Sequence, residues 1–147
     1  SRSMFRAARA ILDCDADAEY AVGEAVLLAW QAFPKLNRPE AARCWLLKIA
    51  VRCAYGLRRR QRRVVYMDDL SQTAGSVPPP EPSGLWDAVL LLPEDQRLVV
   101  MLYYYEDLPV AEIAKTLRVP QGTVKSRLSR GRERLRALLR EEEAYGL

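Results

Sequence analysis

Residues 121–136, near the C-terminal end of the chain, combine short hydroxyl side chains with long cationic ones on one side of a predicted helix. Hydroxyl groups and cations both donate hydrogen bonds to phosphates and to base edges, and an α-helix fits the major groove of DNA. The exposed side is predicted to contain Lys125, Ser126, Ser129, Arg130, Glu133 and Arg134. This stretch therefore predicts a helix that binds nucleic acid.

A shorter helix, predicted over residues 110–117, positions this stretch from the preceding side of a break at Val119-Pro120. Ile113, Ala114 and Leu117 supply its packing surface. The long helix has its own apolar side, formed at helical spacing by Val124, Leu128, Leu135 and Leu138. Gly131 lies on that side, where a small residue lets another helix come close. Together the two helices predict a helix-turn-helix in which the recognition helix begins at Gln121.

A second cationic region spans residues 35–63, with ten Lys or Arg residues against one Glu, compared with eight against one in residues 118–140. Its predicted helix carries an apolar side at Trp45, Leu46, Ile49, Cys53 and Leu57. A cationic stripe with one aromatic residue is formed by Lys48, Arg52, Tyr55, Arg59 and Arg62. Cations hold a nucleic-acid backbone, and an exposed ring can stack on an unpaired base. An ordinary amphipathic helix would explain this spacing but not the ending "LRRRQRR". Two basic blocks on an otherwise acidic chain predict two contacts with a polyanion.

The composition argues against most catalytic and metal-binding functions. The sequence contains no His, which removes the usual general base of Ser-His and Cys-His catalysis. Its three cysteines, Cys14, Cys44 and Cys53, form no CxxC pair, so neither a zinc site nor another cofactor is expected. We interpret them as reduced core thiols of a cytoplasmic protein. Because no run of about 18 apolar residues occurs, no transmembrane helix is predicted. The expected activity is binding, with no catalytic residue.

The chain is predicted to be all-α, with two small domains at residues 1–63 and 85–147 joined by a linker at residues 64–84. Four prolines and several Gly and Ser residues in this linker disfavour helix and favour an extended chain. A surface loop within one domain is the alternative, although such loops are uncommon at this length. Helices are predicted over residues 4–12, 15–33, 39–63, 85–91, 93–105, 110–117 and 121–142. Pro93, Pro109 and Pro120 stand where helices would begin.

The segment "LPEDQRLVVMLYYYEDLPVAEIAKTLRVPQGTVKSRLSRGRERLR" resembles the −35-binding domain of bacterial sigma factors, in particular those of the extracytoplasmic-function (ECF) type. The shared elements are Leu92-Pro93 with Arg97, Glu112-Ile113-Ala114, and Gly122-Thr123-Val124-Lys125-Ser126-Arg127 followed by Arg130. The resemblance implies that the −35 element is contacted by Thr123, Lys125, Ser126, Arg127, Ser129 and Arg130. Arg118 stands where glycine is common in the turn of this family.

The N-terminal half resembles the other main domain of the same family. Trp45-Leu46-x-x-Ile49-Ala50 with its trailing arginines is similar to the segment that melts and reads the −10 element. The resemblance implies −10 contacts by Trp45, Lys48, Arg52, Tyr55, Arg59 and Arg62. Residues 15–33 resemble the helix that docks on the clamp helices of core RNA polymerase, with Tyr20, Glu24, Leu27 and Gln31 as the polymerase-facing candidates. Core packing on all sides is the alternative for this helix.

Three departures from the family pattern accompany the resemblance. Gly23 replaces a usual glutamine and Tyr20 replaces an acid, which concerns the detail of the polymerase contact. Arg52 stands where asparagine is frequent, so the −10 base preference is expected to differ. The chain is also expected to lack the usual first helix of the family's N-terminal domain.

The resemblance implies a transcription initiation factor that binds core RNA polymerase and directs it to promoters through −10 and −35 recognition. An anti-sigma factor is an expected partner, and no membrane insertion is expected. One alternative is a stand-alone helix-turn-helix regulator that binds duplex DNA as a dimer. Another is a basic RNA-binding adaptor. Co-purification with core polymerase is required only by the first of these three functions.

Overall fold

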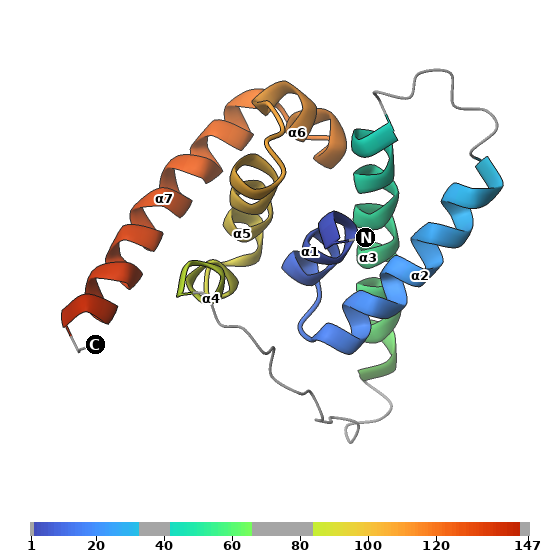
Figure 1. Cartoon of the computed structure of the whole chain (residues 1–147), viewed down its shortest axis with the longest axis horizontal. Helices are drawn as coiled ribbons and strands as arrows, with labels where there is room; N and C mark the ends of the chain where they lie inside the picture. Colours follow the sequence, from blue (N-terminus) through green and yellow to red (C-terminus); the bar gives the residue numbers. More distant parts are fainter. Residues whose placement is uncertain (1, 33–41, 66–83, 145–147) are drawn as a thin grey trace. The chain divides into compact units, whose positions relative to one another are not determined.

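The computed structural model describes residues 2–32, 42–65 and 84–144, and all regular elements in these ranges are helical, as predicted. The chain divides into two compact units, residues 1–78 (unit 1) and residues 79–147 (unit 2). The described residues of the first unit form three helices. Figure 1 shows a longer C-terminal helix beside shorter ones in the second unit. Each unit has its own buried core.

Unit 1 is a three-helix arrangement of α1 (Arg2–Ile11), α2 (Asp15–Ala32) and α3 (Ala42–Val65), each in contact with the other two. The buried side chains at these contacts are mostly alanines, namely Ala7, Ala8, Ala10, Ala18, Ala21, Ala25, Ala29, Ala50 and Ala54. Larger core residues are few, and Ile11, Leu12 and Leu47 are the bulkiest that are fully buried. Alanine adds little volume, so the three helices pack closely.

Two arginines fix the turn between α1 and α2. The Arg9 Nε atom donates to Asp15 Oδ1 at 3.1 Å, and Arg9 Nη1 donates to the Leu12 carbonyl at 2.8 Å. From α3, Arg58 Nη1 donates to the Ile11 carbonyl at 3.0 Å. Carbonyls at the end of a helix lack intrahelical donors, so cationic side chains satisfy them favourably. The end of α1 is therefore tied to α3.

Unit 2 consists of α4 (Gly84–Leu90), α5 (Glu94–Val100), η3 (Met101–Tyr105), α6 (Val110–Leu117) and α7 (Gln121–Ala144). The prolines immediately precede α5, α6 and α7, as predicted. The helix expected over residues 93–105 is α5 continued by η3, a single π-helical turn in which the Glu106 N–H donates to the Met101 carbonyl at 3.3 Å. In Figure 1, α7 runs past the shorter helices, and it contacts α4, α5 and α6.

Both helices that flank the expected linker extend into it. Helix α3 continues to Val65, since nothing at Val64-Val65 breaks a helix, and α4 begins at Gly84. The remaining linker residues, 66–83, lie outside the described residues. Pro39, at which the third helix was expected to start, also lies outside them, and α3 is described from Ala42.

The three cysteines are half-buried free thiols rather than core residues. Cys53 packs against a small core cluster of unit 1 that includes Met4 and Ala25. Burial raises the pKa of the Cys53 thiol, the Glu24 carboxylate adds to the increase, and the Arg60 guanidinium opposes it. A raised pKa disfavours the nucleophilic thiolate, so Cys53 is suited to packing rather than to chemistry.

Gly131 allows α5 and α7 to approach closely, as its position on the apolar side of α7 predicts. A Cβ atom at this position would lie 2.7 Å from Val100 Cγ2 and 3.6 Å from Gln96 Cβ. Val100 is itself buried on a rigid helix, so its branched side chain has little room to move.

Gly131→Ala is expected to lower the free energy of unfolding by about 1–3 kcal/mol, because overpacking forces side chains or backbone to shift. The matched control is Gly122→Ala on the same helix, where an added Cβ meets nothing within 4 Å. That change should be neutral or stabilising by up to about 1 kcal/mol. Thermal and urea unfolding measure both. Val100→Ala in the Gly131→Ala background should recover part of the loss, and equal effects of the two glycine changes would contradict the close contact.

Arg118 occupies the left-handed region at the end of α6, with φ 58° and ψ 48°. Its own N–H donates to the Ala114 carbonyl, and the Val119 N–H donates to the same carbonyl at 3.1 Å. This geometry ends α6 and turns the chain toward α7. For a residue with a Cβ atom, the left-handed conformation costs roughly 1–2 kcal/mol.

Arg118→Gly is therefore expected to raise the free energy of unfolding by up to about 1 kcal/mol, since the relief of strain exceeds the added backbone entropy of glycine in the unfolded chain. Lys115→Gly, in the interior of α6, should instead lower it by about 1 kcal/mol. Urea unfolding at a fixed temperature compares the two variants. A loss of stability in Arg118→Gly as large as that in Lys115→Gly would show that the turn stores no strain.

Candidate nucleic-acid interface

Helices α6 and α7 form the helix-turn-helix that the sequence predicts. Ile113 and Ala114 of α6 are buried, and so are Val124 and Leu128 of α7, whereas Leu117 is half-buried. These contacts set the angle between the two helices. The turn itself contains Arg118 in its left-handed conformation, followed by Val119 and Pro120.

The side of α7 that was predicted to face DNA is exposed. Each of its predicted members is solvent-accessible, namely Lys125, Ser126, Ser129, Arg130, Glu133 and Arg134. On the opposite side, Gly131 is buried with Val124 and Leu128, while Leu135 and Leu138 are half-buried. The first turns of α7 thus present hydroxyls and cations on a rigid helix whose other side is fixed in the core.

Thr123 and Arg127 differ from the other predicted −35 residues because both are half-buried. The Arg127 side chain is 27% exposed, and its Nε atom lies 3.9 Å from Asp95 Oδ2 on α5. Arg127 is therefore directed along the contact between α5 and α7. The sequence did not indicate Asp95 as its partner, because 32 positions separate the two residues and only the fold brings them together.

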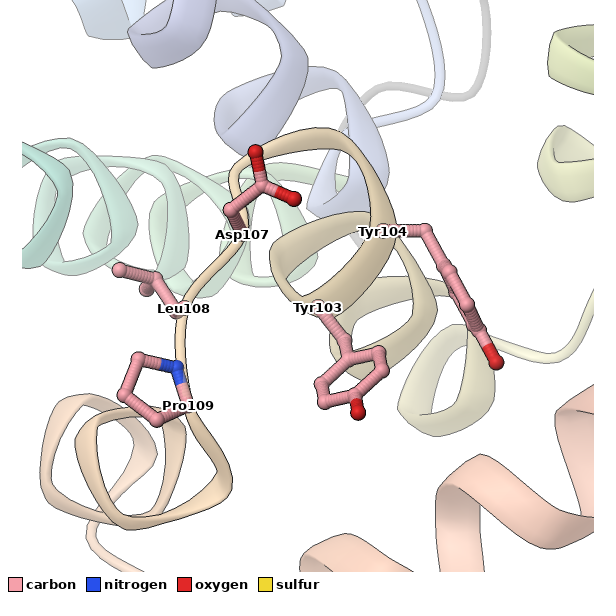
Figure 2. Close-up of a pocket in the computed structure, with 5 residues that line it drawn as sticks. All are labelled: Tyr103, Tyr104, Asp107, Leu108 and Pro109. Carbon is pink, nitrogen blue, oxygen red and sulfur yellow. The ribbon is translucent and has the colours of Figure 1, made fainter.

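Sequence reasoning also missed a cluster of aromatic residues next to α7. A hollow in unit 2 is lined by Tyr103, Tyr104, Asp107, Leu108 and Pro109. Figure 2 shows the two tyrosine rings projecting from η3, while Leu108 and Pro109 belong to the loop that leads to α6. The guanidinium of Arg132, on α7, lies over both rings, 5.8 Å and 5.7 Å from their centroids. The run of three tyrosines was the available signal in the sequence.

In unit 1, the cationic stripe of α3 is mostly accessible. Arg52, Arg59 and Arg62 are exposed, while Lys48, Tyr55 and Trp45 are half-buried. The prediction placed the centre of the apolar side of α3 wrongly. Its fully buried residues are Leu47, Ala50, Val51 and Ala54, whereas Trp45, Leu46, Ile49, Cys53 and Leu57 are half-buried. The buried side is displaced because both α1 and α2 cover α3.

The arginine run at the end of α3 is divided between packing and exposure. In addition to Arg58, which binds the end of α1, Gln61 Nε2 donates to Asp17 Oδ2 at 2.8 Å. Arg60 Nη2 pairs with Glu24 Oε1 at 3.4 Å. Arg59, Arg62 and Arg63 are exposed. Only part of the run is therefore presented for an external polyanion.

The predicted polymerase-facing line of α2 is also accessible, apart from Glu24. Tyr20 is 59% and Leu27 is 65% exposed, and Gln31 is exposed. Glu24 is half-buried and holds Arg60. Further large apolar residues are accessible on the same helix, with Trp30 at 80%. Because these large side chains are exposed and the buried residues of α2 are alanines, core packing on all sides of α2 is excluded.

Both units match known families. Residues 1–64 match the family described as Sigma-70 region 2, and residues 84–135 match Sigma-70, region 4. The ECF RNA polymerase sigma factor SigL of Mycobacterium tuberculosis is 35% identical over 136 residues, which cover 86% of this chain and 76% of that protein. The RNA polymerase sigma factor SigV of Bacillus subtilis is 30% identical over 130 residues, covering 86% and 78% respectively.

Solved structures show the same fold. The sigma factor RpoE from Bartonella quintana, solved in complex with the anti-sigma factor NepR, matches 95% of this chain and 91% of its own with a TM-score of 0.78 and 24% identity. CnrH, solved with the cytosolic domain of CnrY, matches with a TM-score of 0.61 and 21% identity, covering 95% of this chain and 82% of its own.

None of the helices described here has the length and apolar character needed to span a membrane.

The order of the two matched regions decides between the functions that the sequence left open. A stand-alone helix-turn-helix regulator and an RNA-binding adaptor would not account for a region 2 match in unit 1 followed by a region 4 match in unit 2. The chain belongs to the ECF family of RNA polymerase sigma factors, which direct RNA polymerase to promoters.

Proposed function

We propose that the two units divide promoter recognition between them. Unit 2 reads the −35 element as duplex DNA through the first turns of α7, and unit 1 holds the unpaired strand of the −10 element through α3. The observation that carries this proposal is the exposure of Lys125, Ser126, Ser129 and Arg130 opposite a buried apolar side of the same helix. The polymerase supplies the chemistry, and this chain contributes binding in the cytoplasm.

The α7 residues can make two kinds of contact with duplex DNA. Long cations reach phosphates or the acceptor-rich edge of guanine, and serine hydroxyls reach either type of group. Because Val124 and Leu128 are buried in the core, only the opposite, exposed side of α7 can face the bases in the major groove. Arg127, paired with Asp95, is better suited to keep α7 in place on α5 than to read a base. Thr123 lies at the start of the same helix.

Lys125→Ala and Arg130→Ala are each expected to weaken binding to a −35 duplex. A lost base-edge contact should cost about 1–3 kcal/mol and relax specificity at one position, whereas a lost phosphate contact should weaken all sequences alike. Binding of labelled duplexes that carry single substitutions in the −35 element separates the two cases. Unchanged affinity in both variants, with unfolding curves like that of the parent chain, would remove α7 as the reader.

The stripe on α3 is suited to single-stranded DNA. Arg52, Arg59 and Arg62 are exposed cations that can hold phosphates of a strand. A base stacked in duplex hides its faces, so the rings of Tyr55 and Trp45 gain little from duplex, but a melted strand exposes those faces. Lys48 lies one turn before Arg52 on the same side of the helix.

Arg52→Ala combined with Tyr55→Ala is expected to leave polymerase binding and −35 duplex binding nearly unchanged while open-complex formation collapses. The loss follows because phosphate and stacking contacts to the melted strand are both removed. Permanganate reactivity of thymines near −10, measured with the holoenzyme, reports the opening. A pre-melted −10 bubble should restore only part of the activity, since the strand contacts remain lost. Opening at the parent rate would show that the stripe is only a solvated surface.

The exposed side of α2 is the proposed polymerase contact. Tyr20, Leu27 and Gln31 lie on one accessible line, and Glu24 lies on the same line while paired with Arg60. Helix α2 is also the proposed target of an anti-sigma factor, because exposed large apolar side chains favour a protein partner. Two structural neighbours were solved with protein partners, RpoE with the anti-sigma factor NepR and CnrH with the cytosolic domain of CnrY.

A further inference from the structure

We propose that α7 carries a second line of contacts, which holds phosphates of the DNA backbone alongside the bases read by its first turns. This phosphate line consists of Lys125, Ser129, Arg132, Arg136 and Arg140. Its first two residues are shared with the −35 contact described above, and its new members are the three arginines. The proposal rests on duplex binding by α7 and extends it along the helix.

The spacing of the phosphate line places its members on one side of α7. Successive steps of four, three, four and four residues follow the helical repeat. From Lys125 to Arg140 the helix rises about 22 Å at 1.5 Å per residue, so the line spans several backbone phosphates. Four members are exposed, and Arg132 is half-buried. Three acidic residues follow Arg140 in the sequence, so the cationic line ends there.

Arg132 is held in a defined orientation by two tyrosines of η3. Its Nε donates a hydrogen bond to the Tyr104 hydroxyl, and its guanidinium lies over the rings of Tyr103 and Tyr104. The two rings are themselves packed edge to face, with centroids 4.9 Å apart (Figure 2). A guanidinium has five N–H donors, and this bond uses one of them. The remaining fork can bind a phosphate with two parallel bonds, and a side chain already oriented loses less entropy on binding.

An acidic protein surface is the other polyanion that such a line could meet. Two features favour the DNA backbone. The phosphate line borders the side of α7 that carries Ser126 and Arg130, so a duplex that contacts one side also approaches the other. Arginine, which supplies three of the five members, matches the planar geometry of phosphate oxygens. The C-terminal end of a recognition helix can therefore follow the backbone while its N-terminal turns enter the groove.

The decisive experiment compares Arg136→Gln with Arg2→Gln in the full chain. Both arginines are exposed, but Arg2 lies on α1 of unit 1, outside both cationic regions of the sequence. Equilibrium binding to a −35 duplex and to a scrambled duplex is measured over a series of salt concentrations. Arg136→Gln should raise Kd for both duplexes by the same factor and reduce the slope of log K against log salt by about 1. Arg2→Gln, which removes the same charge elsewhere in the chain, should leave the slope unchanged.

Tyr104 is a positioning residue, and its variant tests the orientation of Arg132. Tyr104→Phe keeps the ring and removes the hydroxyl, so it should weaken duplex binding several-fold in the parent chain. In the Arg132→Gln background the same change should have no further effect. Thermal unfolding of each variant provides the control for folding. A loss of affinity that persists without Arg132 would assign Tyr104 a merely structural role and overturn this part of the proposal.

The outcomes separate this inference from the −35 assignment. If the parent chain binds the two duplexes equally, sequence reading by α7 fails, but the difference in salt slope between the two variants still decides on the phosphate line. Equal reductions in the salt slope of the two variants would reflect net charge alone and would overturn the proposal of a phosphate line. Unchanged slopes in both variants would overturn it as well and would favour an acidic protein partner for the three arginines.

Discussion

Close helix approach through small residues is the constraint on which both units depend. In unit 2, Gly131 lets α7 lie against Val100 of α5, with no space for even one added carbon. In unit 1, alanines fill the contacts among α1, α2 and α3. A core built from small residues has little room for large ones. The bulky apolar side chains of α2, such as Leu27 and Trp30, therefore remain accessible, which leaves them for a partner.

Close packing also divides the arginine run of α3 between two environments. This helix packs on two neighbours, so the helical repeat places some residues of the run at the contacts and others in solvent. Arg58 and Gln61 turn inward and bind α1 and α2, while Arg59 and Arg62 turn outward. Arg60 lies between these groups and pairs with Glu24, which joins the proposed polymerase side of α2 to the proposed DNA side of α3. An exposed pair of this kind contributes at most about 1 kcal/mol to stability.

The sequence predicted those features that depend on local rules. Proline positions and helical periodicity located the helices, and Gly131 could be assigned to a close contact because its position on the apolar side of α7 is visible in the repeat. The features that were missed depend on which helix covers which. The buried side of α3 is displaced because two helices share it, Arg127 finds Asp95 only through the contact between α5 and α7, and Arg132 meets Tyr104 across the fold. No pattern along the chain encodes these partners.

A residue in the left-handed backbone conformation follows each of the two helical segments, η3 and α6, that precede the recognition helix α7. Asp107 follows η3 with φ 55°, and Arg118 follows α6 with φ 58°. In each turn, the next N–H donates a hydrogen bond to the preceding helix. The Leu108 N–H donates to the Leu102 carbonyl and the Val119 N–H donates to the Ala114 carbonyl, both at 3.1 Å. Neither residue is glycine, so each turn carries backbone strain, smaller for Asp than for Arg. Such strain persists only where packing determines the conformation. Leu108 is buried directly after the first turn, so the orientation of α6, and with it the presentation of α7, is set by the core rather than by the turns.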